Sequence, residues 1–122
     1  MADQKLKGCQ ILIAEDEYLL ADDLRDELSQ LGADILGPVP SVDEAATLIR
    51  AQTKIDAAVL DINLRGKMIF PIADLLKERG IPFLFATGYD EWAVPDRFAD
   101  IMRVEKPLKA CRIADLVQTM LA

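Results

Sequence analysis

A chain of 122 residues has room for one hydrophobic core, so we expect a single domain over residues 1–122 with no output domain. The formal net charge of -7 argues against a nucleic-acid partner, because such partners are bound mainly through Lys and Arg on phosphates. No apolar run approaches the roughly 20 residues of a membrane span, and the N-terminus lacks a signal-peptide core, so we expect a cytoplasmic protein without a membrane partner.

The residue counts also limit the chemistry. The sequence has no histidine, which excludes histidine-based triads, His-ligated zinc and a phosphohistidine carrier. The two cysteines, Cys9 and Cys111, are far apart and form no CxxC pair, so we expect reduced thiols.

Apolar runs with strand character alternate with segments of helical period along the chain. The runs cover residues 11–14, 33–36, 57–60, 83–86 and 101–104. The run at 57–60 has no polar alternation, which is typical of a strand buried on both faces of a parallel sheet.

Helices are predicted between the strands. The first carries leucines at four- and three-residue spacing, namely Leu20, Leu24, Leu28 and Leu31. Gly32 is expected to end it. The second begins with the capping-box pattern of Ser41 and Glu44. The third has Pro71 in its first turn and ends at Gly80.

The fourth helical segment has the weakest pattern. Residues 88–100 contain aromatic and apolar side chains without a clean period, and Pro95 interrupts any long helix. We expect a short or irregular fourth helix with more mobility than its neighbours, and a last helix from about residue 109. The alternation predicts an α/β fold, a doubly wound five-stranded parallel sheet of order 2-1-3-4-5 with helices on both faces.

Polar side chains follow four of the predicted strands, namely Glu15 with Asp16, then Asp61, Thr87 and Lys106. Taken singly, these residues are typical of helix starts and turns. Because the carboxyl ends of neighbouring parallel strands lie at one edge, we expect the side chains to converge. Clustered carboxylates repel unless a cation joins them, and hard oxygen ligands favour Mg²⁺. The combination therefore predicts a site for a metal ion and a transferring phosphoryl group.

This motif set resembles the receiver domains of two-component response regulators, with their flavodoxin-like fold, over essentially the whole chain. The resemblance implies that Asp61 is the phosphoacceptor and that Thr87 and Lys106 contact the phosphoryl oxygens. It assigns Mg²⁺, or Mn²⁺, to Asp16, Asp61, the backbone carbonyl of Asn63 and, through water, Glu15. It also implies a cis bond between Lys106 and Pro107.

The sequence departs from the family pattern at several positions. Glu15 stands where many receivers have Asp, and Arg65 where many have Pro, so we expect a different turn after Asp61. Arg103 replaces an aromatic residue that swings inward in most receivers, and arginine cannot be buried there without a charge partner.

The Phe-Ala-Thr-Gly-Tyr string at residues 85–89 resembles a subfamily of often stand-alone receivers in which that aromatic residue is also missing. We therefore expect the switch region to comprise Tyr89, Trp92 and Arg103. Our hypothesis is that segment 88–100 reorders in place of the usual two-residue switch.

The implied function is that of a single-domain response regulator phosphorylated on Asp61 by a histidine kinase or phosphotransfer protein. It would signal by docking to an unknown downstream protein, or act as a phosphate sink, and would not be an enzyme beyond slow self-dephosphorylation. One alternative is a pseudo-receiver that only binds partners. Another is a haloacid-dehalogenase-like phosphatase, which needs a second acid two residues after its nucleophile, where this chain has Asn63.

Overall fold

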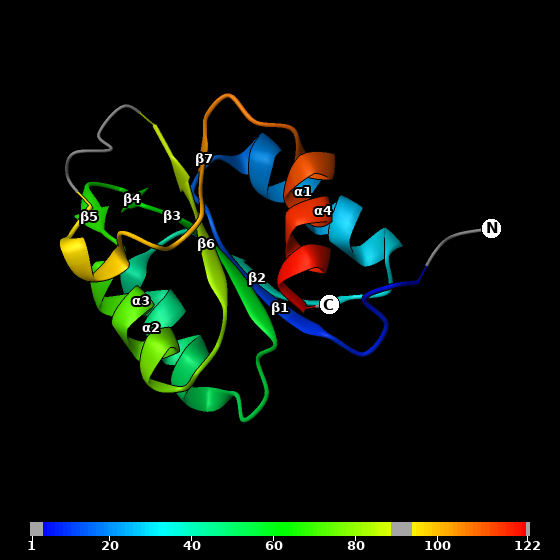
Figure 1. Cartoon of the computed structure of the whole chain (residues 1–122), viewed down its shortest axis with the longest axis horizontal. Helices are drawn as coiled ribbons and strands as arrows, with labels where there is room; N and C mark the ends of the chain where they lie inside the picture. The colour runs from blue at the N-terminus through cyan, green and yellow to red at the C-terminus, as the bar shows by residue number, and fades with distance from the viewer. Residues whose placement is uncertain (1–3, 89–93, 122) are drawn as a thin grey trace.

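A central parallel sheet organises the computed structural model, which describes residues 4–88 and 94–121. Its five strands lie in the order β2-β1-β3-β6-β7 (Figure 1). Their bounds are Gln10–Ala14 (β1), Asp34–Val39 (β2), Ala57–Asp61 (β3), Phe83–Thr87 (β6) and Arg103–Glu105 (β7). All neighbouring strands pair in parallel, which confirms the predicted α/β fold and strand order.

Helices cover both faces of the sheet (Figure 1). One face carries α1 (Tyr18–Gln30) and α4 (Ala110–Leu121), and the other carries α2 (Val42–Ala51) and α3 (Phe70–Glu78). Each face has its own apolar core, and every residue of β3 is buried. A strand enclosed in this way can place a polar side chain only where it ends, which positions Asp61.

The predicted helix ends are confirmed at atomic detail. Gly32 follows α1 with a φ of 94°, a conformation that glycine adopts without steric cost. Ser41 precedes α2, where its hydroxyl accepts a hydrogen bond from the Glu44 backbone N–H at 3.2 Å. The same hydroxyl donates to the Glu44 carboxylate at 2.9 Å. Pro71 lies in the first turn of α3.

The expectation of a short or irregular fourth helix is confirmed within residues 94–100, where the helical structure is a single 3₁₀ helix, η2 (Asp96–Phe98). Phe98 is fully buried and anchors this segment to the α2 and α3 side of the sheet. Its ring centroid lies 5.8 Å from those of Phe70 and Phe85 and 6.3 Å from that of Phe83. The segment is therefore held by packing onto β6.

Two details of the prediction were wrong or incomplete. The last strand begins at Arg103 rather than at residue 101, although the Met102 carbonyl already accepts a hydrogen bond from the Phe85 N–H at 2.9 Å. A small antiparallel hairpin of β4 (Asn63–Leu64) and β5 (Lys67–Met68) was not foreseen. The hairpin comes shortly after β3 in the chain and lies beside the edge of the sheet where β3 ends at Asp61.

Candidate functional site

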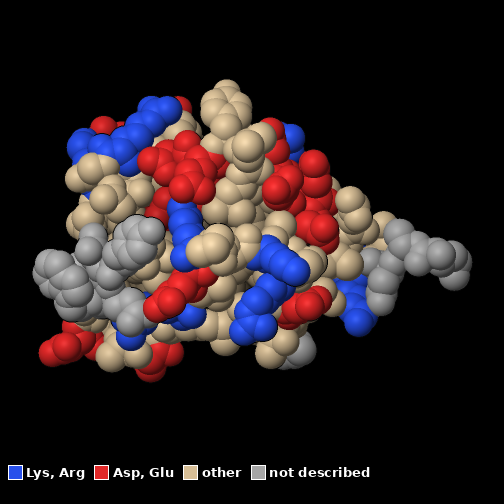
Figure 2. Space-filling model, turned by 90° about the horizontal axis from the view of Figure 1, so that it is seen from above, with Lys and Arg blue, Asp and Glu red and all other residues tan. Residues whose placement is uncertain are grey.

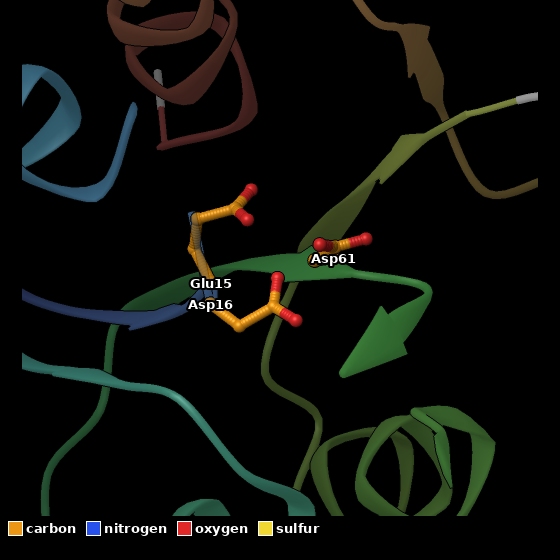
Figure 3. Close-up of side chains that lie close together, drawn as sticks. All are labelled: Glu15, Asp16 and Asp61. Carbon is orange, nitrogen blue, oxygen red and sulfur yellow. The ribbon is translucent and has the colours of Figure 1, made fainter. Parts of the chain in front are cut away.

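Three carboxylates meet at the carboxyl ends of β1 and β3. These strands are direct neighbours, with Ala14 paired to Leu60, so the residues that follow them lie at one edge of the sheet. Glu15, Asp16 and Asp61 each offer an oxygen within 4.8 Å of the others. Figure 3 shows their carboxyl groups around a common gap, two from the end of β1 and one from the end of β3. The predicted convergence is confirmed.

Lys106 follows the edge strand β7 and joins this cluster at the same carboxyl edge of the sheet. Its Nζ lies 3.0 Å from Asp61 Oδ2 and 3.1 Å from Glu15 Oε1. A longer contact of 3.7 Å reaches Glu17, a residue that was not expected in the site. The Lys106 backbone N–H donates to the Thr87 carbonyl at 2.8 Å, which extends the β6–β7 pairing and fixes where the lysine leaves the sheet. The peptide bond between Lys106 and Pro107 is cis, as expected.

The site opens as a pocket of about 480 Å³ whose lining includes Asp16, Asp61, Thr87 and Lys106. Glu15, Asp61 and Thr87 are 3%, 6% and 2% exposed, so these three polar side chains are largely shielded from solvent. Figure 2 shows one face of the molecule, on which basic side chains are interrupted by acidic ones.

Burial dominates the protonation of the acids. It raises the pKa of Glu15 to about 8, with a further increase from the charge of Asp61 and a decrease from the hydrogen bond of the Glu17 N–H. Burial also raises the pKa of Asp61, against the hydrogen bonds from Glu15 and Lys106. Burial alone would lower the pKa of Lys106, but its bonds to Asp61 and Glu15 raise it. One ammonium thus faces two buried carboxyl groups.

This arrangement fits a hard divalent cation. Buried carboxylates whose pKa is raised by desolvation gain most when a positive charge joins them. Oxygen donors at a partly open position suit Mg²⁺, which binds through one or two carboxylates and keeps several waters. Glu15, Asp16 and Asp61 supply such oxygen donors at the edge of the pocket. Glu15 and Asp61 are also buried, unlike the residues of an ordinary surface acid cluster.

The β4–β5 hairpin forms one wall of the pocket. Asn63 donates its backbone N–H to Asp61 Oδ1 at 3.2 Å, and its side-chain oxygen accepts from the Gly66 N–H at 2.8 Å. Arg65 has a φ of 52° and donates its N–H to Asp16 Oδ2 at 3.1 Å. Proline can supply neither this φ nor an N–H, so the expected difference in the turn is confirmed.

The expected switch residues are only partly described. Arg103 lies on β7 with an exposed side chain, in agreement with the expectation that arginine is not buried there. Tyr89 and Trp92 lie outside the described residues, so the hypothesis that their segment reorders stays a prediction. Thr87 ends β6 and lines the pocket.

Comparison with known proteins places the chain among signalling proteins. No protein-family model matches it. SdrG from Sphingomonas melonis Fr1 is 40% identical, with a TM-score of 0.79 over 93% of this chain and 97% of SdrG. A BeF3-activated conformation of SdrG, from Pseudomonas melonis Fr1, is 38% identical over the whole of both chains, with a TM-score of 0.74. The PhyR response regulator REC domain of Erythrobacter litoralis is 26% identical, with a TM-score of 0.81 over 95% of this chain and 92% of that one.

Among curated proteins, the sensory transduction protein LytT of Bacillus cereus is 32% identical over an alignment of 115 positions that covers 91% of this chain and 45% of LytT. The chain spans about half the length of the curated relatives it matches. Sequence, fold and site agree: the chain belongs to the receiver domains of response regulators, the proteins of two-component signalling. Within the described residues, no helix is both long and apolar enough to cross a membrane.

Proposed function

We propose that Asp61 accepts a phosphoryl group from the phosphohistidine of a histidine kinase or phosphotransfer protein. The observation that carries this proposal is the setting of the Asp61 carboxylate. Its Oδ2 lies 3.0 Å from Lys106 Nζ and its Oδ1 accepts the Asn63 N–H, at the edge of a pocket with room for a phosphoryl group. Because these 122 residues include no histidine, the donor histidine lies outside them.

In the proposed transfer, a carboxylate oxygen of Asp61 attacks phosphorus and forms an acyl phosphate. The bond from phosphorus to the donor nitrogen breaks, and its electron pair returns to the imidazole. Lys106 keeps its proton on Nζ, and its fixed positive charge neutralises the phosphoryl oxygens. The Thr87 hydroxyl, which lines the same pocket, donates a hydrogen bond to one of these oxygens.

Asp16, Asp61, the backbone carbonyl of Asn63 and, through water, Glu15 are the groups that would hold Mg²⁺ or Mn²⁺. When bound, the cation supplies positive charge that stabilises the phosphoryl oxygens during transfer. The protein itself contributes the buried carboxylates and the hairpin that orients them.

We further propose that residues 1–122 act as a stand-alone receiver that docks to a downstream protein or drains phosphate from a kinase, with no enzymatic role beyond slow self-dephosphorylation. The likeness to SdrG supports this proposal, because the two chains match over nearly their whole lengths. SdrG is known in a BeF3-activated conformation, and this supports a change of conformation on phosphorylation in the present chain as well. We propose that the change occurs in segment 88–100.

The experiment is to incubate the protein with Mg²⁺ and acetyl phosphate and to weigh the intact chain. The expected result is a gain of one phosphoryl group that Asp61→Asn abolishes. Asp115→Asn, on the exposed side of α4, should leave the gain unchanged. A wild-type chain that gains no mass would support a pseudo-receiver, and sustained consumption of the donor would support an aspartate phosphatase; both results contradict the proposal.

A further inference from the structure

The β4–β5 hairpin turns on two residues with left-handed backbone. The φ is 52° at Arg65 and 86° at Gly66, as in the type I′ turns that join tightly paired strands. Glycine adopts this conformation freely, whereas the Cβ of arginine crowds the following carbonyl. A non-glycine residue held in this way needs a contact that offsets the crowding.

That contact is made to the acidic cluster. The Arg65 N–H donates to Asp16 Oδ2 at 3.1 Å, a link between residues 49 positions apart in the sequence. Proline at position 65 would lack both the donor and the positive φ. The bond therefore requires a residue other than proline at position 65, where many receivers have proline.

The same hairpin also holds the second carboxylate. Asn63 donates its N–H to Asp61 Oδ1 at 3.2 Å, and its side chain accepts from the Gly66 N–H at 2.8 Å, which ties the start of the hairpin to its turn. One short element thus binds one oxygen of Asp16 and one of Asp61. Asp16 is held through Oδ2 and can offer Oδ1 to a cation. The oxygens of Asp61 keep further lone pairs beside those that accept from Asn63 and Lys106.

We propose that the β4–β5 hairpin sets the geometry of the cation site, and that the backbone N–H of Arg65 is the group that positions Asp16. The inference rests on the proposed function, because the cation site is part of it. Arg65 is a positioning residue, since it acts through Asp16. Coupling of this kind is reciprocal, so cation binding also stabilises the hairpin conformation by the same factor.

The test measures Mn²⁺ affinity by the electron paramagnetic resonance of the free ion, without a phosphodonor. Arg65→Pro removes the N–H, and we expect it to weaken binding about tenfold, as the loss of groups that orient metal ligands typically does. Arg65→Asn and Arg65→Gly keep the N–H and tolerate a positive φ, so we expect affinities within about twofold of wild type. Equal affinity in all three variants, or a loss in Arg65→Asn as large as in Arg65→Pro, would overturn the inference.

A second measurement does not depend on the folding of Arg65→Pro. In a titration of wild-type protein with Mg²⁺ followed by amide NMR, we expect the Arg65 amide to shift with the same apparent affinity as that of Asn63. The Lys54 amide, outside the site, serves as the unshifted control. An Arg65 amide that stays in place while that of Asn63 moves would refute the role of the hairpin turn.

These outcomes separate the inference from the proposed function. A wild-type protein that binds no Mn²⁺ contradicts the cation site and the inference together. Tight binding that Arg65→Pro leaves unchanged contradicts the inference alone. A protein that binds Mn²⁺ in the expected variant-dependent way but gains no phosphoryl group contradicts only the proposed phosphotransfer.

Discussion

Lys106 bonds to both carboxylate oxygens of Glu15, with Nζ at 3.1 Å from Oε1 and 3.2 Å from Oε2. The glutamate follows β1 and the lysine follows the edge strand β7, and β3 and β6 lie between these two strands. The contact therefore links the ends of two strands that are not neighbours, and the same ammonium also binds Asp61 between them. Much of the electrostatic behaviour of the apo protein should depend on this one group.

Lys106→Met should lower the free energy of unfolding at pH 7.5 in EDTA by about 1–3 kcal/mol, the range for leaving a buried polar group without its partner. Without the ammonium, the buried carboxyl groups of Glu15 and Asp61 would lose a hydrogen-bond donor that they share. Urea denaturation measures the change. Lys109→Met removes an exposed lysine and should have little effect; equal losses in the two variants would contradict the prediction.

The stability of the apo protein should fall as pH rises from about 5 to 8. The folded chain holds the Glu15 proton up to a pKa of about 8, against an ordinary value of 4.5, so between these values the folded state binds more protons than the unfolded one. Stability then decreases with pH, by at most about 1.4 kcal/mol per pH unit for one group. Glu15→Gln should flatten this decline and Glu78→Gln, on the surface, should not. Parallel curves for all three proteins would rule out Glu15 as the cause.

Mg²⁺ should stabilise the folded protein, and more so at pH 8 than at pH 5, because it binds the ionised carboxylates. A ligand at one hundred times its dissociation constant contributes about 2.7 kcal/mol. Thermal unfolding in MgCl₂, compared with NaCl of equal ionic strength, measures the gain. Asp16→Asn should lose most of it; if the variant gains as much as wild type, Asp16 is not a ligand.

Phe98→Ala should destabilise the protein by about 3–5 kcal/mol, the usual cost of removing a buried aromatic ring. The ring is fully buried against Phe70, Phe83 and Phe85. The neighbouring Arg97 forms an exposed ion pair with Asp74 at 2.9 Å, and Arg97→Ala should cost much less because solvent screens such pairs. Urea midpoints compare the two, and similar losses would show that packing by Phe98 does not anchor this segment.

The sequence allowed the main site to be located because the central strands are buried on both faces. In such strands, the first polar residue marks the sheet edge, which is why Asp61 and Thr87 could be placed from apolar runs alone. The neighbouring order of β1 and β3 then brought Glu15 and Asp16 to Asp61.

The hairpin could not be predicted because each of its strands has two residues, too few to show a period. Its turn is Arg-Gly, whereas Asn-Gly or Asp-Gly is the usual signal. The conformation of Arg65 depends on Asp16, which is distant in sequence, so a tertiary contact overrides the local preference. Phe98 was recognised as apolar, but its burial depends on three rings from α3 and β6.

The two outer strands of the sheet limit how this protein can associate with others. In β2, the two residues Gly37 and Pro38 face a single residue of β1, and proline has no N–H to offer a further strand. At the opposite edge, β7 has only three residues, and Arg103 and Glu105 are exposed and charged. Such edges disfavour growth of the sheet by strand addition and protect against aggregation. Partners should therefore recognise side chains on helices and loops rather than the backbone of the sheet.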